Sequence, residues 1–276
     1  MKTKLLVVGL CWFITGPAFT QSKSGWQGKK CVVSLTYDDA LNVHLDQVAP
    51  ALDSLGLKGT FFVSGYSGAF TKRVGDWRAL ATKGHELGNH TLYHPCAGKP
   101  VGRGFVVPEY DLDLYSVKRM ADEMKMTNAL LQALDGKSKR TFAYPCGDTL
   151  ASGKPYYGAA KENFIAARGV HPEYVPVNGL HAANVGSFMV NGQTGEELIA
   201  LVKKAIESQT GIVFLFHGVG GEHSLNVSLT AHRQLIKYLK QHEKEIWVAT
   251  FLDMAEFALN NKTLPAARPE SKTKKK

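Results

Sequence analysis

Ile212-Val213-Phe214-Leu215-Phe216 is an unbroken apolar run that ends at His217. A run of this kind, without polar alternation, is typical of a strand buried on both faces, as in a parallel sheet covered by helices. The segment Cys31-Val32-Val33-Ser34-Leu35-Thr36-Tyr37 is a second β-rich run, and the carboxylates of Asp38 and Asp39 follow it directly. Both runs predict interior strands with polar side chains just past their ends.

Strand-like and helix-like segments alternate on both sides of these two runs. Shorter strands are predicted at 60–63, 141–144, 164–167 and 246–251. Helical patterns are predicted at 42–55, 72–83, 112–134, 196–208, 229–243 and 253–259. Repeated strand–helix units without a break in composition predict one α/β domain. The number of strands favours a distorted (β/α) barrel with seven or eight parallel strands over an open sheet.

Composition limits the classes of partner. The 276 residues are 44% hydrophobic and 21% charged, so the chain can bury a sizeable core. Of the net charge of +9, two positive charges lie in Lys2 and Lys4 and four in the tail 267–276, which leaves +3 for the body. No basic stripe is interleaved with aromatic residues, so a nucleic-acid partner is not expected. No glycine-rich phosphate loop follows a strand, so a nucleotide cofactor is not expected either.

The first twenty residues have the pattern of a signal peptide. Lys2 and Lys4 precede the apolar run 5–14, and Ala18-Phe19-Thr20 offers small residues at a cleavage site. We therefore predict a signal peptide at 1–20 and an exported protein, periplasmic or extracellular; a membrane anchor that is retained is the alternative. No other stretch is suited to a stable membrane span. The remaining boundaries are a segment at 21–29, one main domain at 30–262 and a basic, disordered tail at 263–276.

Asp38 and Asp39 are the first candidates for chemistry. In a parallel barrel the active site lies at the C-terminal ends of the strands, where these two residues are expected. Adjacent carboxylates repel each other unless a cation neutralises one of them, and the other can then act as a base. The alternative interpretation is a turn and a helix cap ahead of Asn42.

His90 and His94 form the second candidate pair. Their i, i+4 spacing predicts that both imidazoles lie on one face of a helical turn, where they can bind one metal ion. Two histidines and one carboxylate with an open position suit catalytic zinc. The alternative is a pair of incidental histidines at a solvent-facing helix start. His85 lies off this face, so we interpret it as structural.

His217 is the third candidate because it directly follows the apolar run that ends at Phe216. A histidine at the end of a buried strand is well placed for proton transfer. Taken alone, it is better explained as a satisfied histidine at the edge of the core.

Four short motifs, in this order, resemble those of the polysaccharide deacetylase (NodB-homology) family, which is carbohydrate esterase family four. They are Thr36-Tyr37-Asp38-Asp39-Ala40, His90-Thr91-Leu92-Tyr93-His94, Ala143-Tyr144-Pro145-Cys146-Gly147 and Leu215-Phe216-His217. The resemblance covers about 30–259 and implies that 30–262 is a deacetylase catalytic domain. It implies that Asp39, His90 and His94 hold a divalent metal, with Zn²⁺ as the default. It also implies that Asp38 is the catalytic base and His217 the general acid.

The third motif departs from the family pattern at two positions. Ala143 stands where many members have an arginine that orients the base, and Cys146 stands where an aromatic residue is usual. Tyr144, Pro145 and Cys146 are nevertheless expected in the oxyanion and substrate-binding region. The backbone N–H of Cys146 can serve as the oxyanion donor because that role needs no particular side chain.

The fourth motif of the family, an aspartate-rich stretch that pairs with the acid histidine, has no match. Arg168, His181 and Asn184 lie in the corresponding part of the chain, but none of them fits the pattern. The sequence therefore leaves open what orients His217.

Three cysteines would remain after cleavage of the signal peptide: Cys31, Cys96 and Cys146. Cys96 follows the second motif and Cys146 lies inside the third, and both motifs must approach the metal. We predict a disulfide between Cys96 and Cys146 with Cys31 free; three buried, reduced thiols are the alternative.

The activity that the resemblance implies is removal of N- or O-linked acetyl groups from a polysaccharide or oligosaccharide, by metal-activated water. The expected partner is an acetylated glycan, of a kind that the sequence does not specify, and the oligomeric state is left open. Two alternatives remain: an amidase acting on a small non-sugar amide, and a carbohydrate-binding protein with a catalytically dead site. The loop 98–111 is expected to rim the cleft, because long loops at this face set specificity.

Overall fold

The computed structural model describes residues 25–261 and is built around one parallel sheet. The predicted signal peptide and the whole of the predicted basic tail lie outside the described residues. The strands of the sheet follow the order β7-β4-β3-β2-β1-β9-β8, and β12 pairs with β1. Their bounds are β1 Cys31–Asp38, β2 Thr60–Val63, β3 Glu86–Asn89, β4 Thr141–Ala143, β7 Ala166–Arg168, β8 Phe188–Met189, β9 Gly211–Phe216 and β12 Ile246–Ala249.

The sheet closes into a ring through the segment 185–189. Val185 forms a parallel bridge with Arg168 on β7, and Phe188 pairs with Phe214 on β9. The two edges of the sheet are thereby joined. The predicted distorted (β/α) barrel is confirmed, with seven parallel strands in the ring. Two further strand pairings divide the length of β1: β12 pairs with its first half and β2 with its second half.

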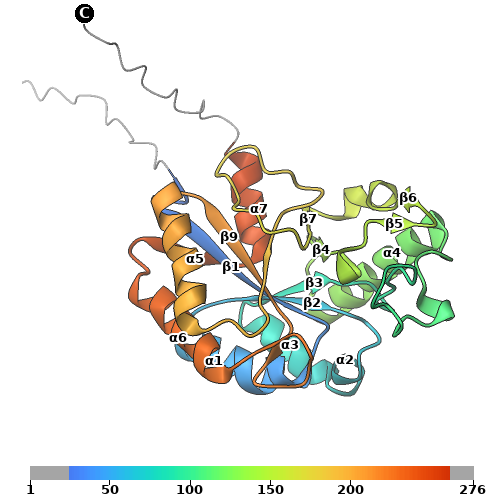
Figure 1. Cartoon of the computed structure of the whole chain (residues 1–276), viewed down its shortest axis with the longest axis horizontal. Coiled ribbons are helices and arrows are strands. Elements are labelled where there is room, and N and C mark those ends of the chain that lie inside the picture. Colours follow the sequence, from blue (N-terminus) through green and yellow to red (C-terminus); the bar gives the residue numbers. More distant parts are fainter. Residues whose placement is uncertain (1–24, 262–276) are drawn as a thin grey trace, which may run out of the picture.

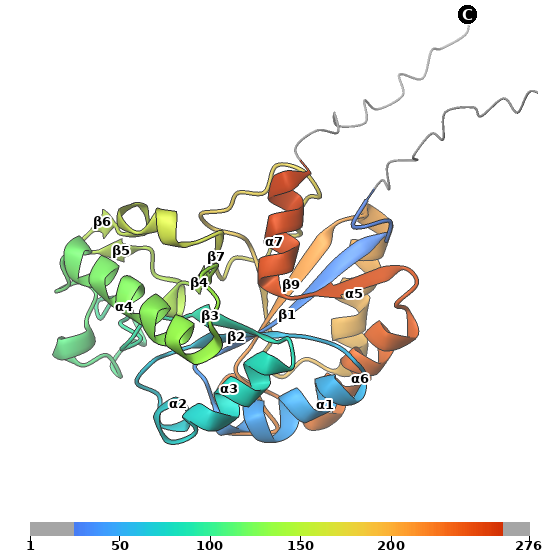
Figure 2. The same cartoon turned by 180° about the vertical axis from the view of Figure 1, so that it is seen from behind.

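Helices cover the outside of the barrel (Figures 1 and 2). They are α1 Ala49–Ser54, α2 Gly68–Lys72, α3 Val74–Thr82, α4 Val117–Asp135, α5 Gly195–Ser208 and α6 Leu229–Gln241, whereas α7 Phe251–Asn260 packs at one end of the barrel. A π-helical turn, His44–Val48, leads into α1, and 3-10 turns lie at Pro108–Tyr110, Pro145–Gly147, Tyr157–Ala159 and Lys161–Asn163. Two short strand pairs, β5 Leu150–Ala151 with β6 Lys154–Pro155 and β10 Gly218–Val219 with β11 Asn226–Val227, lie outside the main sheet. Among the described helices none is long and apolar enough to cross a bilayer.

The alternation of side chains along each strand separates two cores. On β1 the odd-numbered Val33 and Leu35 pack with the outer helices, whereas Val32 packs inside the barrel with Phe62 and Val213. Successive side chains on a strand point to opposite faces, so Asp38 shares the inward face with Val32. Because Asp38 and Val32 lie on the same face of β1, the side chain of Asp38 points into the mouth of the barrel.

Helix α7 fills the opposite end of the barrel. Its residues Phe251, Met254, Ala255 and Ala258 belong to the interior cluster. The buried carboxylate of Glu86 accepts the backbone N–H of Leu252 at 2.9 Å, in the first turn of α7. Acidic groups are favourable at a helix N-terminus, so this contact fixes α7 against the strands.

One helix begins later than the sequence predicts. The apolar pattern predicts a helix from Leu112, but α4 begins at Val117, after Ser116 caps it by accepting the backbone N–H of Arg119 at 3.1 Å. Leu112 instead donates its backbone N–H to the carbonyl of Cys96 at 2.9 Å. The competing partner is far away in the sequence, so helical periodicity could not reveal it.

Candidate active site

Four strand ends bring polar side chains to one end of the barrel. Asp38 ends β1, His90 follows β3, Arg168 ends β7 and His217 follows β9. Each lies an even number of residues from an inward-facing residue of its own strand, so the pleat turns them all to the interior. The site is therefore a consequence of strand register.

Asp39, His90 and His94 converge as the sequence predicts. Nε2 of His90 lies 3.5 Å from Oδ1 of Asp39, and Nε2 of His94 lies 3.3 Å from the same oxygen. One ligand atom from each residue lies within 4.8 Å of the other two. These residues therefore form a candidate metal site, while their role as ligands stays a prediction.

The backbone between the two histidines is not the predicted helical turn. His90 directly follows the strand β3, and Thr91 and His94 both have left-handed φ angles, of 65° and 52°. Asn89 Oδ1 accepts the N–H of Thr91 at 2.8 Å, and Thr91 Oγ1 accepts the N–H of His94 at 2.9 Å. The turn is held by these side chains, and it brings the two imidazoles together with their ring centroids 4.7 Å apart.

The hydrogen bond of His90 prepares it to bind a cation. Its Nδ1–H donates to the carbonyl oxygen of Ala143 at 2.9 Å, which leaves the lone pair of Nε2 directed at Asp39. Oδ1 of Asp39 is buried and has no hydrogen-bond partner among the described residues. Burial alone would lower the pKa of His90, but the carboxylates of Asp38 and Asp39 raise it above its usual value. An orphaned carboxylate oxygen in a negative potential fits a divalent metal ion.

Asp38 forms an ion pair with Arg168, and both side chains are almost fully buried. Burial raises the pKa of Asp38, but the guanidinium and then the imidazole of His90 outweigh it, so the pKa lies below its usual value. The arginine also lies over the ring of Phe62, 5.2 Å from its centroid. Asp38 is thus held in its charged, proton-accepting form. The sequence analysis considered Arg168 only in relation to the motif that pairs with His217, and it did not predict an ion pair with Asp38.

His217 is held without a carboxylate partner. Its Nδ1 is buried and has no hydrogen-bond partner in the described part of the chain. Its ring stacks on that of His223, with centroids 4.6 Å apart, and its carbonyl oxygen accepts a hydrogen bond from His44 at 2.8 Å. Burial is the largest influence and lowers the pKa of His217. His223 was not a sequence candidate, because it lies in a glycine-rich loop that has no periodic pattern.

A family model described as polysaccharide deacetylase matches residues 26–159. The matched region contains the first three motifs and all three candidate metal ligands. Residues 26–159 belong to the polysaccharide deacetylase family. His217 and Arg168 lie beyond the matched residues.

Solved structures of the family share the fold. A polysaccharide deacetylase of Mycobacterium smegmatis aligns over 88% of this chain and 96% of its own, with a TM-score of 0.61 and 18% identity. The corresponding domain of a multidomain xylanase from the hindgut metagenome of Trinervitermes trinervoides aligns over 82% of this chain and 89% of its own, with a TM-score of 0.53 and 18% identity. An acetyl xylan esterase of Clostridium thermocellum, solved with a cobalt ion, covers 81% and 89% of the two chains at 20% identity, with a TM-score of 0.50.

Relatives found by sequence are longer proteins. A gellan lyase of a Bacillus species is 27% identical over an alignment of 255 residues that covers 83% of this chain and 9% of that protein. The uncharacterized protein YlxY of Bacillus subtilis is 26% identical over 106 residues, which are 38% of this chain and 28% of that protein. The chain therefore spans less than a third of the length of either relative.

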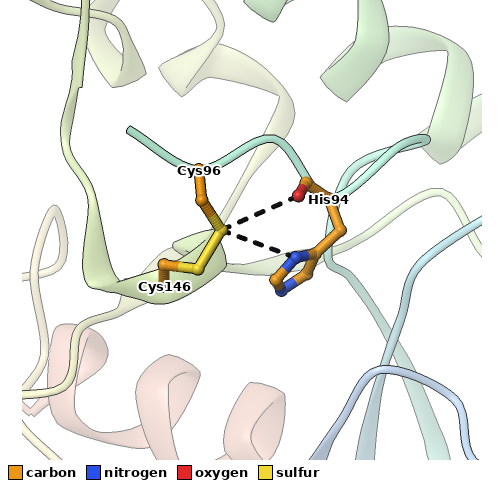
Figure 3. Close-up of side chains that lie close together, drawn as sticks. All are labelled: His94, Cys96 and Cys146. Atoms are coloured by element: carbon orange, nitrogen blue, oxygen red, sulfur yellow. Dashed lines mark hydrogen bonds between the residues drawn. A yellow bond between two sulfur atoms is a disulfide. The ribbon is translucent and has the colours of Figure 1, made fainter. Parts of the chain in front are cut away.

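The second and third motifs are joined by the predicted disulfide between Cys96 and Cys146, which are separated by 50 positions in the sequence. Figure 3 shows Sγ of Cys96 beside the imidazole of His94, and the distance to Nδ1 is 3.7 Å. A disulfide sulfur can only accept, so this contact favours a proton on Nδ1 and a free lone pair on Nε2. Cys31 is the free cysteine among the described residues, and burial raises its pKa to about 12.

The third motif contributes to the wall of the active-site hollow. Tyr144 and Cys146 line this cavity of about 650 Å³, together with Asp38, His90, His217 and other residues. Cys146 has a left-handed φ of 55°, and the hydroxyl of Tyr144 donates to the carbonyl of Ala183 at 2.7 Å. Pro145 is buried and is not among the lining residues. The loop 98–111 contributes Arg103 and Phe105 to the rim, as expected.

Proposed function

We propose that the protein is an exported, metal-dependent hydrolase that removes acetyl groups from a polysaccharide or oligosaccharide. Family membership supports deacetylation of a carbohydrate. The signal-like pattern of residues 1–20 supports export. The observation that carries the proposal is the convergence of Asp39, His90 and His94 beside the buried Asp38–Arg168 pair, at the wall of one hollow.

Asp39, His90 and His94 would hold the metal ion. Two imidazoles and one carboxylate favour zinc, although similar ligand sets accept other divalent ions. When bound, such an ion lowers the pKa of a water molecule and polarises the acetyl carbonyl group. One nitrogen or oxygen atom from each of these three residues lies within 4.8 Å of the other two, which supports this assignment.

Asp38 would take the proton of the attacking water. Its depressed pKa keeps it ionised at neutral pH, and the guanidinium of Arg168 fixes its orientation. Orientation matters because a general base must lie within hydrogen-bond reach of the proton that it accepts. A carboxylate held by a single buried partner is suited to that requirement.

His217 would protonate the leaving nitrogen or oxygen, and the backbone N–H of Cys146 would stabilise the oxyanion. Both residues line the hollow that contains Asp38. His217 comes from β9, whereas Asp38 comes from β1 and Cys146 from the turn after β4. Separate elements allow an acid and a base to approach the reacting carbon from different sides. No nucleophilic side chain is required, because water is the nucleophile.

Two variants test this proposal directly. Asp38→Asn removes the base and should abolish acetate release while the protein still binds metal. His90→Ala removes a ligand and should abolish both. The substrates are a panel of N- and O-acetylated oligosaccharides, with small acetamides included because an amidase would prefer those. Retained turnover in either variant would refute the assignment, and metal binding without turnover of any substrate by the wild type would favour a dead binding protein.

A further inference from the structure

We propose that His223 is a positioning residue, whose ring holds the imidazole of His217 in place for its proposed role as the general acid. The inference rests on the proposed function and deepens it, because it names the group that does for His217 what Arg168 does for Asp38. Three observations carry it: a stacked contact between two rings, the hydrogen bond that fixes the ring of His223, and a loop that is anchored to the segment after the first motif.

The rings of His217 and His223 lie face to face. Their centroids are 4.6 Å apart and their planes differ by 13°. Nδ1 of His217 has no hydrogen-bond partner among the described residues, so no hydrogen bond to that atom fixes the rotation of the ring. His44 binds the carbonyl oxygen of His217, and it therefore holds the main chain rather than the imidazole. A flat ring against one face of the imidazole limits the angles through which the side chain can rotate.

A backbone hydrogen bond fixes the orientation of the His223 ring. Its Nδ1 accepts the N–H of Leu225 at 3.0 Å, so the ring in its neutral form carries the proton on Nε2. That nitrogen lies 3.6 Å from Oδ2 of Asp39, whereas the two candidate histidine ligands approach Oδ1. A protonated ring nitrogen has no lone pair for a cation, which sets His223 apart from the candidate ligands. One edge of its ring thus faces Asp39 while its flat face lies against His217.

The loop that carries His223 is anchored next to the site. The carboxylate of Glu222 accepts the side-chain amide of Asn42 and the backbone N–H of Val43, both at 2.6 Å. Asn42 and Val43 lie just after the first motif, so these bonds join the loop after β9 to the loop after β1. The short strands β10 and β11 pair with each other before and after the segment. The ring of His223 is therefore presented from an anchored main chain.

The stacked contact has a consequence that depends on the leaving group. A general acid must lie within hydrogen-bond reach of the atom that it protonates, so an imidazole that rotates freely is a poorer acid. The leaving nitrogen or oxygen of a sugar needs that proton, because it departs as a poor anion. A phenolate with a nitro group departs without one. Loss of the His223 ring should therefore slow the first kind of substrate and spare the second.

The test measures kcat and KM with an acetylated sugar and with 4-nitrophenyl acetate. The sugar is tetra-N-acetylchitotetraose or acetylated xylotetraose, whichever releases acetate faster with the wild type. We expect His223→Ala to lower kcat for the sugar about tenfold while KM and the rate with the aryl ester change by less than about twofold. His223→Phe restores a flat ring and should recover most of the loss. His181→Ala is the matched control, since this histidine is exposed and does not line the active-site hollow.

A double variant separates positioning from a general structural role. If His223 acts through His217, the double variant His217→Ala with His223→Ala should be no slower than His217→Ala alone, because no imidazole is left to hold. An unchanged kcat of His223→Ala with the sugar, an equal loss with both substrates, a further loss in the double variant or no recovery by His223→Phe would each overturn the positioning role. Acetate release by the wild type would still uphold the proposed function.

If the wild type releases acetate from neither sugar, the proposed function fails, and ring motion decides the positioning role. The full chain is labelled with ¹³C-histidine, and NMR relaxation reports the motion of the His217 ring on the picosecond-to-nanosecond timescale. Greater motion in His223→Ala than in His181→Ala supports the role, because the stacked ring is what restrains the imidazole. Equal motion in the two variants overturns it.

Discussion

Arg168 on β7 forms an ion pair with Asp38 on β1. On the sheet, Arg168 is in register with Ala143 on the neighbouring strand β4. Neighbouring residues in a parallel pair of strands point to the same face, so the side chain of Arg168 enters the barrel beside the methyl group of Ala143. Many family members carry an arginine at the position of Ala143 to orient the base. In this chain the guanidinium comes from the adjacent strand instead, while the backbone carbonyl of Ala143 orients His90.

We expect Arg168→Met to reduce kcat about 100-fold. Without the guanidinium the carboxylate of Asp38, the proposed base, is no longer held in one position, and small misplacements of a catalytic group have effects of that size. The free energy of unfolding should fall by about 3–5 kcal/mol, because Asp38 is left buried and unpaired. Acetate release and urea unfolding measure the two effects. An unchanged kcat would show that the arginine has no part in positioning the base.

The double variant Ala143→Arg with Arg168→Ala is the matched test of the register argument. This variant moves the arginine from β7 to the position in register on β4, where its side chain can enter the space that the Arg168 side chain leaves on the same face of the sheet. We expect it to recover a measurable part of the activity that Arg168→Ala alone loses. No recovery in a folded double variant would mean that the two positions are not interchangeable.

The barrel and the histidine pair follow from local patterns in the sequence, whereas the choice of Asp39 as the third candidate ligand follows from the resemblance to the family. The apolar runs before Asp38 and His217 predict buried strands, and the parallel arrangement predicts that their ends meet. The partner of Asp38 could not be predicted, because β7 is three residues long and its register with β4 is set by long-range pairing. His90 and His94 have the spacing of a helical turn, but the hydrogen bonds of Asn89 and Thr91 hold an irregular turn instead.

The Cys96–Cys146 disulfide should stabilise the fold and the metal site together. Replacing both cysteines by serine should lower the free energy of unfolding by roughly 4 kcal/mol, from the loop-closure entropy of a link across 50 residues. Metal affinity should fall as well, because the link holds the segment that carries His94. Urea unfolding and metal titration test these effects, with Cys31→Ser as the control. A loss below about 1 kcal/mol would show that other contacts hold the two motifs together.

Stability should fall as the pH is lowered below about 6.5, because His232 is buried in its neutral form. Burial lowers its pKa to about 3, and it is hydrogen-bonded to the hydroxyl of Tyr37 at 2.8 Å. Between these two pH values the unfolded chain binds a proton that the folded chain does not, so each pH unit costs up to about 1.4 kcal/mol for this group.

His232→Gln removes that titration and keeps a polar group near Tyr37. We expect the dependence of unfolding free energy on pH to become shallower by about the same amount between pH 6 and 4. His44, whose pKa is lowered to about 4 by burial, should continue to titrate and leave a residual slope. Identical slopes in the variant and the wild type would exclude His232 as a source of acid sensitivity.

Zinc titration of the metal-free protein, with acetate release followed at each addition, tests whether Asp39, His90 and His94 hold a catalytic metal ion. We predict that activity appears in proportion to metal up to about one ion per chain, and that His94→Ala neither binds zinc with comparable affinity nor gains activity. Full acetate release by the metal-free protein, or tight zinc binding that survives the loss of His94, would contradict it.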